Sequence, residues 1–205
     1  VELFKSDLKN KEPKPITIGI TGTNGKTSTV LSLAQALTYQ NKKVGVISSE
    51  GAGILPNLDE NEYTTPPIDI CYKYLRSFIK RKCDYVIIEC SSQGLHQGRL
   101  DGIHFTYSII TNIDQDHIDY HKSLKNYIDS KLKILNQSRT SILNFDSKNL
   151  KKIDHRKYKC KDILYISQNK IKEKKIINIP SREKLSPLKN LNSYSLFMIF
   201  AVMML

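Results

Sequence analysis

The stretch Ile16-Thr17-Ile18-Gly19-Ile20-Thr21-Gly22-Thr23-Asn24-Gly25-Lys26-Thr27-Ser28 combines an apolar strand pattern, a glycine-containing loop and a helix start. Gly22 and Gly25 let the backbone curl, so that successive N–H groups can point at an anion. The helix that begins near Lys26 adds its positive dipole end. Lys26 supplies a mobile positive charge for β- and γ-phosphates, and Thr27 supplies a hydroxyl for Mg²⁺. The stretch therefore predicts a phosphate-binding loop between a strand and a helix.

This loop departs from the usual P-loop pattern at one position. The pattern requires a glycine at position 20, whereas this chain has Ile20 and carries Gly19 one residue earlier. The alternative is a glycine-rich turn that binds no ligand. Because a Gly-Lys-Thr sequence that follows a strand is hard to explain structurally, we favour a variant P-loop.

Strand and helix patterns alternate along most of the 205 residues. We expect strands at 16–21, 43–49, 84–90, 106–113, 140–144 and 163–167, and helices at 26–40, 66–82, 123–136 and 190–205. Residues 50–65 are expected to form a loop, and residues 147–188 short strands and loops. Such alternation predicts an α/β fold with a doubly wound, mostly parallel open sheet.

The two ends of the chain differ from its middle. Residues 1–15 are polar and contain Pro13 and Pro15, so we expect a linker or the tail of a missing N-terminal domain. Residues 16–205 are expected to form one domain. The chain has no initiator methionine and stops inside the apolar run 196–205, so both ends are expected to be cut. That run is too short to cross a bilayer, and we expect no membrane partner.

Charge and cysteine content exclude some classes of function. The net charge is +12, but lysine is spread over the whole chain. Its densest stretches, Lys148–Lys161 and Lys170–Lys175, show no recognisable RNA-binding pattern of interleaved aromatic residues, so we expect no nucleic-acid partner. A basic surface also suits small anionic substrates. The four cysteines form no C-x-x-C pair, which indicates reduced thiols in a cytoplasmic protein. No Cys/His cluster suits zinc, and no Ser-His-Asp set is evident.

Polar residues gather after the predicted strands, where ligands bind in open α/β sheets. Glu89 ends an apolar strand, as a Walker-B carboxylate does when it holds Mg²⁺. Its alternative role is to cap the next turn. Asn112 and His117 follow the next strand. Spacing alone leaves His117 open between a ligand and a loop residue, because Mg²⁺ prefers oxygen.

Three ordered motifs resemble the signatures of the Mur ligases. They are Thr21–Ser28, with its displaced glycine, then Glu89–Leu95, then Thr111–His121, and the resemblance covers about residues 14–146. Within that family, Thr64-Thr65-Pro66 and Gln97-x-Arg99 are similar to the ligases that add the third peptide residue to UDP-N-acetylmuramoyl-L-alanyl-D-glutamate. The resemblance implies partners of two kinds, the UDP-muramoyl-dipeptide and an amino acid, either L-lysine or meso-diaminopimelate.

The resemblance also implies a reaction. A carboxylate attacks the γ-phosphate of ATP, and the incoming amine then displaces phosphate from the acyl phosphate. The residues expected to contact the nucleotide are Gly22, Thr23, Asn24, Gly25, Lys26, Thr27, Ser28 and Asn112. One Mg²⁺ would be held by Thr27 or Ser28, and a second by Glu89 and His117. These cations would offset the repulsion between the attacking carboxylate and the γ-phosphate of ATP.

A lysine carries a further implication of the resemblance. The family has a carbamylated lysine in a Tyr-x-x-x-Lys context, which Tyr127-Ile128-Asp129-Ser130-Lys131 matches. Carbamylation by CO₂ would turn Lys131 into a carboxylate suited to a hard metal. Without the resemblance, Lys131 reads as an ordinary surface lysine. Contacts to the UDP-muramoyl-peptide are implied for Thr64, Thr65, Ser91, Gln97 and Arg99.

Several alternatives stay open. Mur ligases have three domains, and this chain resembles the central ATP-binding domain without the C-terminal ligase domain. The central domain alone is expected to be inactive and monomeric. Folylpolyglutamate synthase shares the loop and fold, but Ile118-Asp119-Tyr120-His121 argues against it. A non-catalytic nucleotide-binding module is the third possibility. The presence of Glu89, His117 and Lys131 together argues against that module, because a pure binder needs no second metal.

Overall fold

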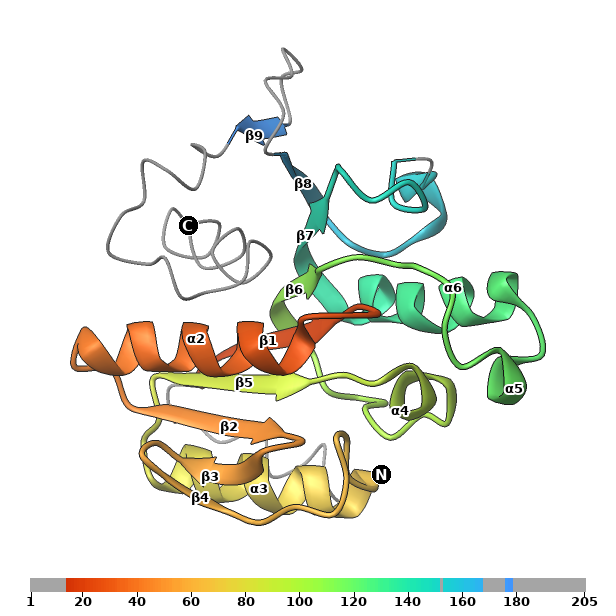
Figure 1. Ribbon diagram of the computed structural model, residues 1–205. Helices are drawn as coiled ribbons and strands as arrows, with labels where there is room; N and C mark the ends of the chain where they lie inside the picture. The colour runs from red at the N-terminus through yellow and green to blue at the C-terminus, as the bar shows by residue number, and fades with distance from the viewer. Residues whose placement is uncertain (1–13, 152, 168–175, 179–205) are drawn as a thin grey trace.

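The computed structural model describes residues 14–151, 153–167 and 176–178, and one sheet organises them (Figure 1). Its nine strands have the order β4-β3-β2-β5-β1-β6-β7-β8-β9. The strand bounds are β1 Ile16–Thr21, β2 Val44–Ser48, β3 Gly51–Ile54, β4 Asn57–Asp59, β5 Tyr85–Glu89, β6 Phe105–Ile110, β7 Ser138–Asn144, β8 Asp162–Ser167 and β9 Ile176–Asn178.

The sheet is mostly parallel, as predicted. β1 lies between β5 and β6 and is parallel to both. In the order β2-β5-β1-β6-β7-β8-β9, each strand is parallel to its neighbours. Only β3 runs against its two neighbours. The chain leaves β1 for β2, returns to β5 and then crosses to β6, so the strand order reverses around β1. Ligands bind in such open sheets at this reversal, beyond the carboxyl ends of the strands.

Helices cover both faces of the sheet. They are α2 Lys26–Tyr39, α3 Ile68–Lys80, α4 Ser92–His96, α5 Ile118–His121 and α6 Leu124–Leu132, with 3₁₀ segments at Lys133–Gln137 and His155–Lys157. The side chains of β5 divide between two cores, with Ile87 packed with α2 and Val86 and Ile88 with the α3 and α6 side. This explains its continuous apolar run, because a parallel strand is buried on both faces. None of the described helices has the length and apolar character needed to span a membrane.

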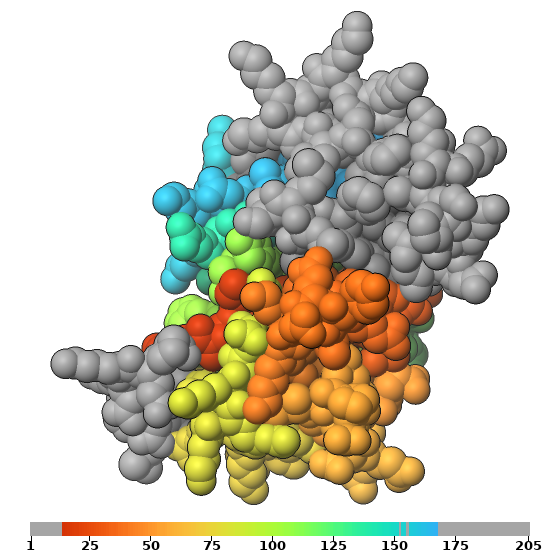
Figure 2. Space-filling model, turned by 90° about the vertical axis from the view of Figure 1, so that its left-hand side faces the viewer, coloured from red at the N-terminus to blue at the C-terminus, as the bar shows by residue number. Residues whose placement is uncertain are grey.

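Helix α2 starts at the phosphate loop and finishes at the opposite end of the sheet. Its predicted inward residues Val30, Leu33, Ala34 and Leu37 are all buried. Figure 2 looks at the end where α2 finishes, and the segment of α2 and β2 (orange) lies in the middle of the described surface. Figure 1 shows the loop at the other end of α2, at the carboxyl ends of β1, β2 and β5.

The structure differs from the expected elements in residues 50–65. That range was expected to be a loop, yet it contains β3 and β4, which extend the sheet in antiparallel fashion beyond β2. Gly51 and Gly53 lie inside β3, where local propensity disfavours a strand. The backbone hydrogen bonds to β2 stabilise β3 as a strand, although its local sequence does not predict one.

Other boundaries shift by a few residues. The helix expected at 123–136 is α6, which ends at Leu132 and continues as the 3₁₀ segment Lys133–Gln137. The short helices α4 and α5 were not predicted, because four or five residues show no periodicity. The helix expected at 190–205 and most of the linker expected at 1–15 lie outside the described residues.

The glycine displaced from the usual P-loop position has a packing role. Gly19 lies inside β1, and a Cβ atom there would come within 2.9 Å of Phe105 Cε1 and 3.0 Å of Ile134 Cδ1. Those side chains belong to the core on the α6 side of the sheet. Gly19 therefore permits close packing behind the strand and does not form part of the loop that faces a ligand.

Candidate functional site

A cavity of about 360 Å³ lies beyond the carboxyl ends of the central strands. Residues from six segments line it, namely Lys26, Thr27, Ser49, Thr64, Glu89, Ser91, Ser92, Gln93, His117 and Lys131. In Figure 1 the arrowheads of β2 and β5 point toward this end, where α4 lies. The residues predicted to be catalytic or to hold metal, namely Lys26, Thr27, Glu89, His117 and Lys131, all line this one cavity.

Glycines give the loop after β1 its curvature. Gly22 has φ 152°, and a Cβ atom there would lie 1.9 Å from Thr111 Oγ1. Gly25 precedes α2 in the left-handed conformation, with φ 80°. A side chain at Gly22 has no room, so the loop in this form requires glycine there.

Asn112 holds the loop in place. Its Oδ1 accepts a hydrogen bond from the Asn24 N–H at 3.0 Å, and its Nδ2 donates to the Asn24 carbonyl at 2.9 Å. The Thr23 N–H donates to the Asn112 carbonyl at 2.9 Å. Asn112 is 4% exposed. Its side chain was predicted to contact the nucleotide, and in this structure the side chain is bonded to Asn24 while the Thr23 N–H is bonded to the Asn112 main-chain carbonyl.

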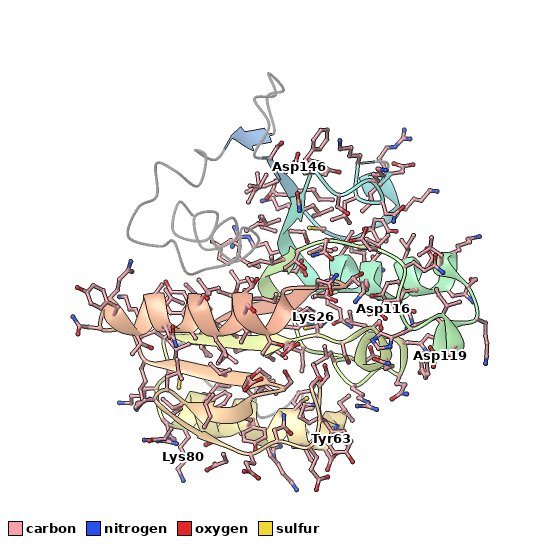
Figure 3. All side chains as sticks on the ribbon, viewed as in Figure 1. Lys26, Tyr63, Lys80, Asp116, Asp119 and Asp146 are labelled. Atoms are coloured by element: carbon pink, nitrogen blue, oxygen red, sulfur yellow. The ribbon has the colours of Figure 1, made fainter. Side chains whose placement is uncertain are left out.

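Two lysines converge on one carbonyl of the loop. Lys26 Nζ donates to the carbonyls of Gly22 at 3.1 Å and Thr23 at 3.0 Å. Lys131 Nζ, from α6, donates to the same Gly22 carbonyl at 2.6 Å. Burial lowers the pKa of Lys26, although Glu89 and Asp116 raise it in part. Figure 3 shows Lys26 and Asp116 at this end of the sheet.

Lys131 is not the surface residue that its local sequence indicates. It is 1% exposed, and its Nζ lies 4.7 Å from the centre of the Tyr127 ring. Burial, and then the charge of Lys26, lower the pKa of Lys131 to about 7. At neutral pH about half of these amines would be uncharged, against about one in a thousand or fewer for an ordinary lysine. Only an uncharged amine has the lone pair needed to react with CO₂.

Glu89 is the carboxylate of the site. It is 1% exposed, and its Oε1 accepts a hydrogen bond from Thr27 Oγ1 at 2.9 Å. Its Oε2 accepts from the N–H of Ser49 at 3.1 Å and from Ser49 Oγ at 3.2 Å. A buried carboxylate beside a hydroxyl is a donor set that fits Mg²⁺, which takes oxygen ligands. Ser28, the other candidate hydroxyl, is exposed.

Ser49 is a site residue that the sequence analysis missed. It follows β2 directly and also lies 3.1 Å from Thr27, measured between the two hydroxyl oxygens. The available signal was its position at the end of a buried strand, next to the strand that carries Glu89. Sequence reasoning placed three strand ends at the site, and β2 supplies a fourth.

His117 lines the cavity from the side of α5. It has φ 48° and precedes α5, and its side chain is 47% exposed. Its Nε2 lies 3.5 Å from Asp116 Oδ2. Among residues 14–151, 153–167 and 176–178, no three His, Cys, Asp or Glu side chains are close enough to hold a metal ion together. His117 and Glu89 are brought to one cavity but make no hydrogen bond to each other.

The predicted substrate residues form a connected strip beside the cavity. Thr65 Oγ1 donates to the Glu89 carbonyl at 2.8 Å and accepts from the Ser91 N–H at 2.9 Å. Arg99 Nη1 donates to the Thr65 carbonyl at 2.8 Å, and Arg99 Nε donates to Gln97 Oε1 at 2.8 Å. Thr64 and Ser91 line the cavity, whereas Gln97 and Arg99 lie outside its lining.

Comparison with known proteins agrees with this fold and this loop. The sequence pattern of the Mur ligase middle domain matches residues 20–197. The UDP-N-acetylmuramoyl-L-alanyl-D-glutamate–2,6-diaminopimelate ligase of Wigglesworthia glossinidia brevipalpis is 40% identical over 131 residues, which cover 63% of this chain and 26% of that protein. The chain thus spans about a quarter of the length of this curated relative.

Two solved structures are similar to this one. A UDP-N-acetylmuramoyl-L-alanyl-D-glutamate–2,6-diaminopimelate ligase has a TM-score of 0.73 at 27% identity, over 85% of this chain and 36% of that chain. A bifunctional folylpolyglutamate synthase/dihydrofolate synthase has a TM-score of 0.60 at 16% identity, over 97% of this chain and 60% of that chain. The second likeness concerns the fold alone. Because the family pattern spans most of the chain and the cavity presents its three ordered motifs, the chain belongs to the Mur ligase middle-domain family.

Proposed function

We propose that this chain supplies the ATP-handling part of a ligase that joins an amino acid to a carboxylate through an acyl phosphate. The observation that carries the proposal is the hydrogen bond of 2.9 Å between Thr27 and Glu89 in the same cavity as Lys26 and Lys131. A phosphate loop, an acidic strand end and a second buried lysine together exceed what nucleotide binding alone needs.

The phosphate loop would bind the nucleotide through its backbone and Lys26. In this structure Lys26 donates to two loop carbonyls, so we expect its flexible side chain to turn toward the β- and γ-phosphates when they are present. Its lowered pKa reflects burial, and a neighbouring phosphate would favour the charged form again. Asn112 would act by fixing the loop.

Oxygen donors for Mg²⁺ are available from Thr27 and Glu89, and we assign one ion to them. A bound Mg²⁺ supplies charge neutralisation for the transferring phosphoryl group. We assign a second ion to His117 and to Lys131 in its carbamylated form, together with Glu89. The amine of Lys131, with a pKa of about 7, is suited to modification by CO₂.

The names of the relatives support a specific pair of substrates. We propose UDP-N-acetylmuramoyl-L-alanyl-D-glutamate as the acceptor, with Arg99 offering its guanidinium to a carboxylate or phosphate. We propose meso-diaminopimelate as the added amino acid, rather than L-lysine, because the relative and the structure named above are both 2,6-diaminopimelate ligases. The partner domains, a monomeric state and a cytoplasmic location stay predictions.

The proposal is tested in two steps. Isothermal titration of the 205-residue chain with Mg²⁺ and ADP should give binding that Glu89→Gln weakens about 10- to 100-fold. A chimera in which residues 14–146 replace the matching segment of the Wigglesworthia relative should release phosphate only when acceptor and meso-diaminopimelate are both present. Nucleotide binding without phosphate release, in a folded chimera, would favour the non-catalytic module.

A further inference from the structure

The short helix α5 contacts the predicted substrate residues through Tyr120, which is bonded to Gln97. His117 at its start lines the cavity, while Tyr120, three residues later, contacts the end of α4. The Tyr120 hydroxyl oxygen lies 2.9 Å from Gln97 Nε2 and 3.0 Å from His96 Nδ1. One turn of helix therefore carries a cavity residue at one end and a contact to α4 at the other.

The hydrogen bonds to Arg99 and Tyr120 fix the orientation of the Gln97 side-chain amide. Arg99 can only donate, so Gln97 must present its carbonyl oxygen Oε1 to Arg99 Nε, at 2.8 Å. The amide nitrogen of Gln97 must then face Tyr120 and donate to its hydroxyl. His96 Nδ1 lies 3.0 Å from the same hydroxyl, and in the tautomer with its proton on Nε2 it accepts the hydroxyl proton. The Gln97 amide is therefore held at both ends, with its nitrogen bonded to the Tyr120 hydroxyl and its oxygen bonded to Arg99.

Two further contacts hold the guanidinium of Arg99 in place. Arg99 Nη1 donates to the Thr65 carbonyl at 2.8 Å, and the guanidinium carbon lies 5.7 Å from the centre of the Tyr63 ring. The other N–H groups of Arg99 have no hydrogen-bond partner among the described residues, so one edge of the fork can meet an anion. Figure 3 shows Tyr63 in the segment that precedes α3.

The ring of Tyr120 is itself held in place. It packs edge-on against His121, with 4.7 Å between ring centres, and against His96, at 5.6 Å. His121 is 3% exposed and packs in turn against the buried ring of Tyr127, at 5.3 Å. Because the ring is fixed by aromatic neighbours, the hydroxyl has a defined position relative to α4.

We propose that Tyr120 is a positioning residue, which orients the Arg99 guanidinium through Gln97 for an anionic group of the acceptor. This inference rests on the proposed function, in which Arg99 meets a carboxylate or phosphate of the acceptor. Tyr120 does not touch the acceptor in this scheme. Its hydroxyl removes conformational freedom from Gln97 and Arg99 before binding, and such preorganisation strengthens binding by lowering its entropic cost.

The variant Tyr120→Phe keeps the ring and removes the hydroxyl. In ¹H–¹⁵N spectra of the 205-residue chain, we expect the Nε–Hε signal of Arg99, assigned with Arg99→Lys, to shift. In the chimera we expect the KM for the acceptor to rise about five- to tenfold, the value of one lost hydrogen bond, with the KM for ATP unchanged. The matched control is Tyr107→Phe, since Tyr107 is half-buried and its hydroxyl makes no hydrogen bond to the described residues.

Each outcome is decisive. An Arg99 signal and an acceptor KM that both stay as in the parent protein would overturn the inference. Equal rises in both KM values would also overturn it, because they would indicate general damage. If the Arg99 signal shifts but Arg99→Ala leaves the acceptor KM unchanged, the positioning by Tyr120 is supported and the acceptor role in the proposed function is refuted.

Discussion

Replacing Lys131 by methionine tests the central electrostatic feature of the site. Methionine has a similar length and is apolar, so it fills the buried space without a charge. The pKa of Lys131 is lowered from 10.5 to about 7, with burial as the main cause. Between these values the unfolded chain binds more protons than the folded chain, so the contribution of Lys131 to stability rises with pH across that window.

The magnitude follows from the two pKa values. At pH 7 the folded protein carries a penalty of about 4 kcal/mol for this lysine, and at pH 9 about 2 kcal/mol. The substitution also removes the hydrogen bond to the Gly22 carbonyl, worth about 1 kcal/mol. Gly22 keeps its second donor, Lys26. We therefore expect Lys131→Met to raise the free energy of unfolding at pH 7 by about 3 kcal/mol and to abolish ligation in the chimera.

Urea unfolding of the 205-residue chain at pH 7 and pH 9, in buffers free of CO₂, measures this effect. The difference between the parent chain and Lys131→Met should change by about 2 kcal/mol over this interval. Lys133→Met, an exposed lysine two residues later, is the control and should show no such change. If the difference for Lys131→Met is independent of pH, the lysine is charged when folded and the reasoning fails. Added bicarbonate should stabilise the parent chain and Lys133→Met but not Lys131→Met, because only Lys131 would be modified.

Two further predictions concern the loop and the metal site. Gly22→Ala places a Cβ atom 1.9 Å from Thr111 Oγ1, so we expect a loss of about 2 kcal/mol or more in stability and at least about tenfold weaker ADP binding, by urea unfolding and calorimetry. Parent-like values for both would mean that the loop adopts another conformation. Ser49→Ala leaves Glu89 Oε2 with only the Ser49 N–H, so the Mg²⁺ concentration needed for half-maximal ADP binding should rise about three- to tenfold, while binding without Mg²⁺ stays the same. An unchanged Mg²⁺ requirement would show that Ser49 does not position the carboxylate.

Much of the fold could be predicted because periodicity is a local property. The continuous apolar run of β5 and the stripe of α2 each follow from neighbours within a few residues, and both predictions are confirmed. The pair β3 and β4 could not be predicted, since Gly51 and Gly53 oppose strand formation locally and only the edge of β2 stabilises it. Short elements such as α5 depend on tertiary contacts for the same reason.

The candidate site divides in a similar way. The sequence by itself determined which chemical groups are present and in what order, because the phosphate loop, Glu89 and the segment that carries His117 each follow a strand whose carboxyl end must face the same crevice. It did not determine what surrounds each group. The bonds of Asn112 to the loop were not foreseen, and Ser49 was missed, because hydrogen bonds between distant segments leave no local pattern.

Lys131 shows this limit most clearly. Its sequence neighbours predict an exposed cation, and only the resemblance to a family singled it out. In the tertiary structure it is buried against Tyr127 and donates to Gly22, 109 residues away in the chain. A pKa depends on the dielectric surroundings and on nearby charges, here the protein interior and Lys26. Those surroundings exist only once α6 has packed beside the loop. The sequence therefore determines that a lysine stands at position 131, and the tertiary structure determines its lowered pKa.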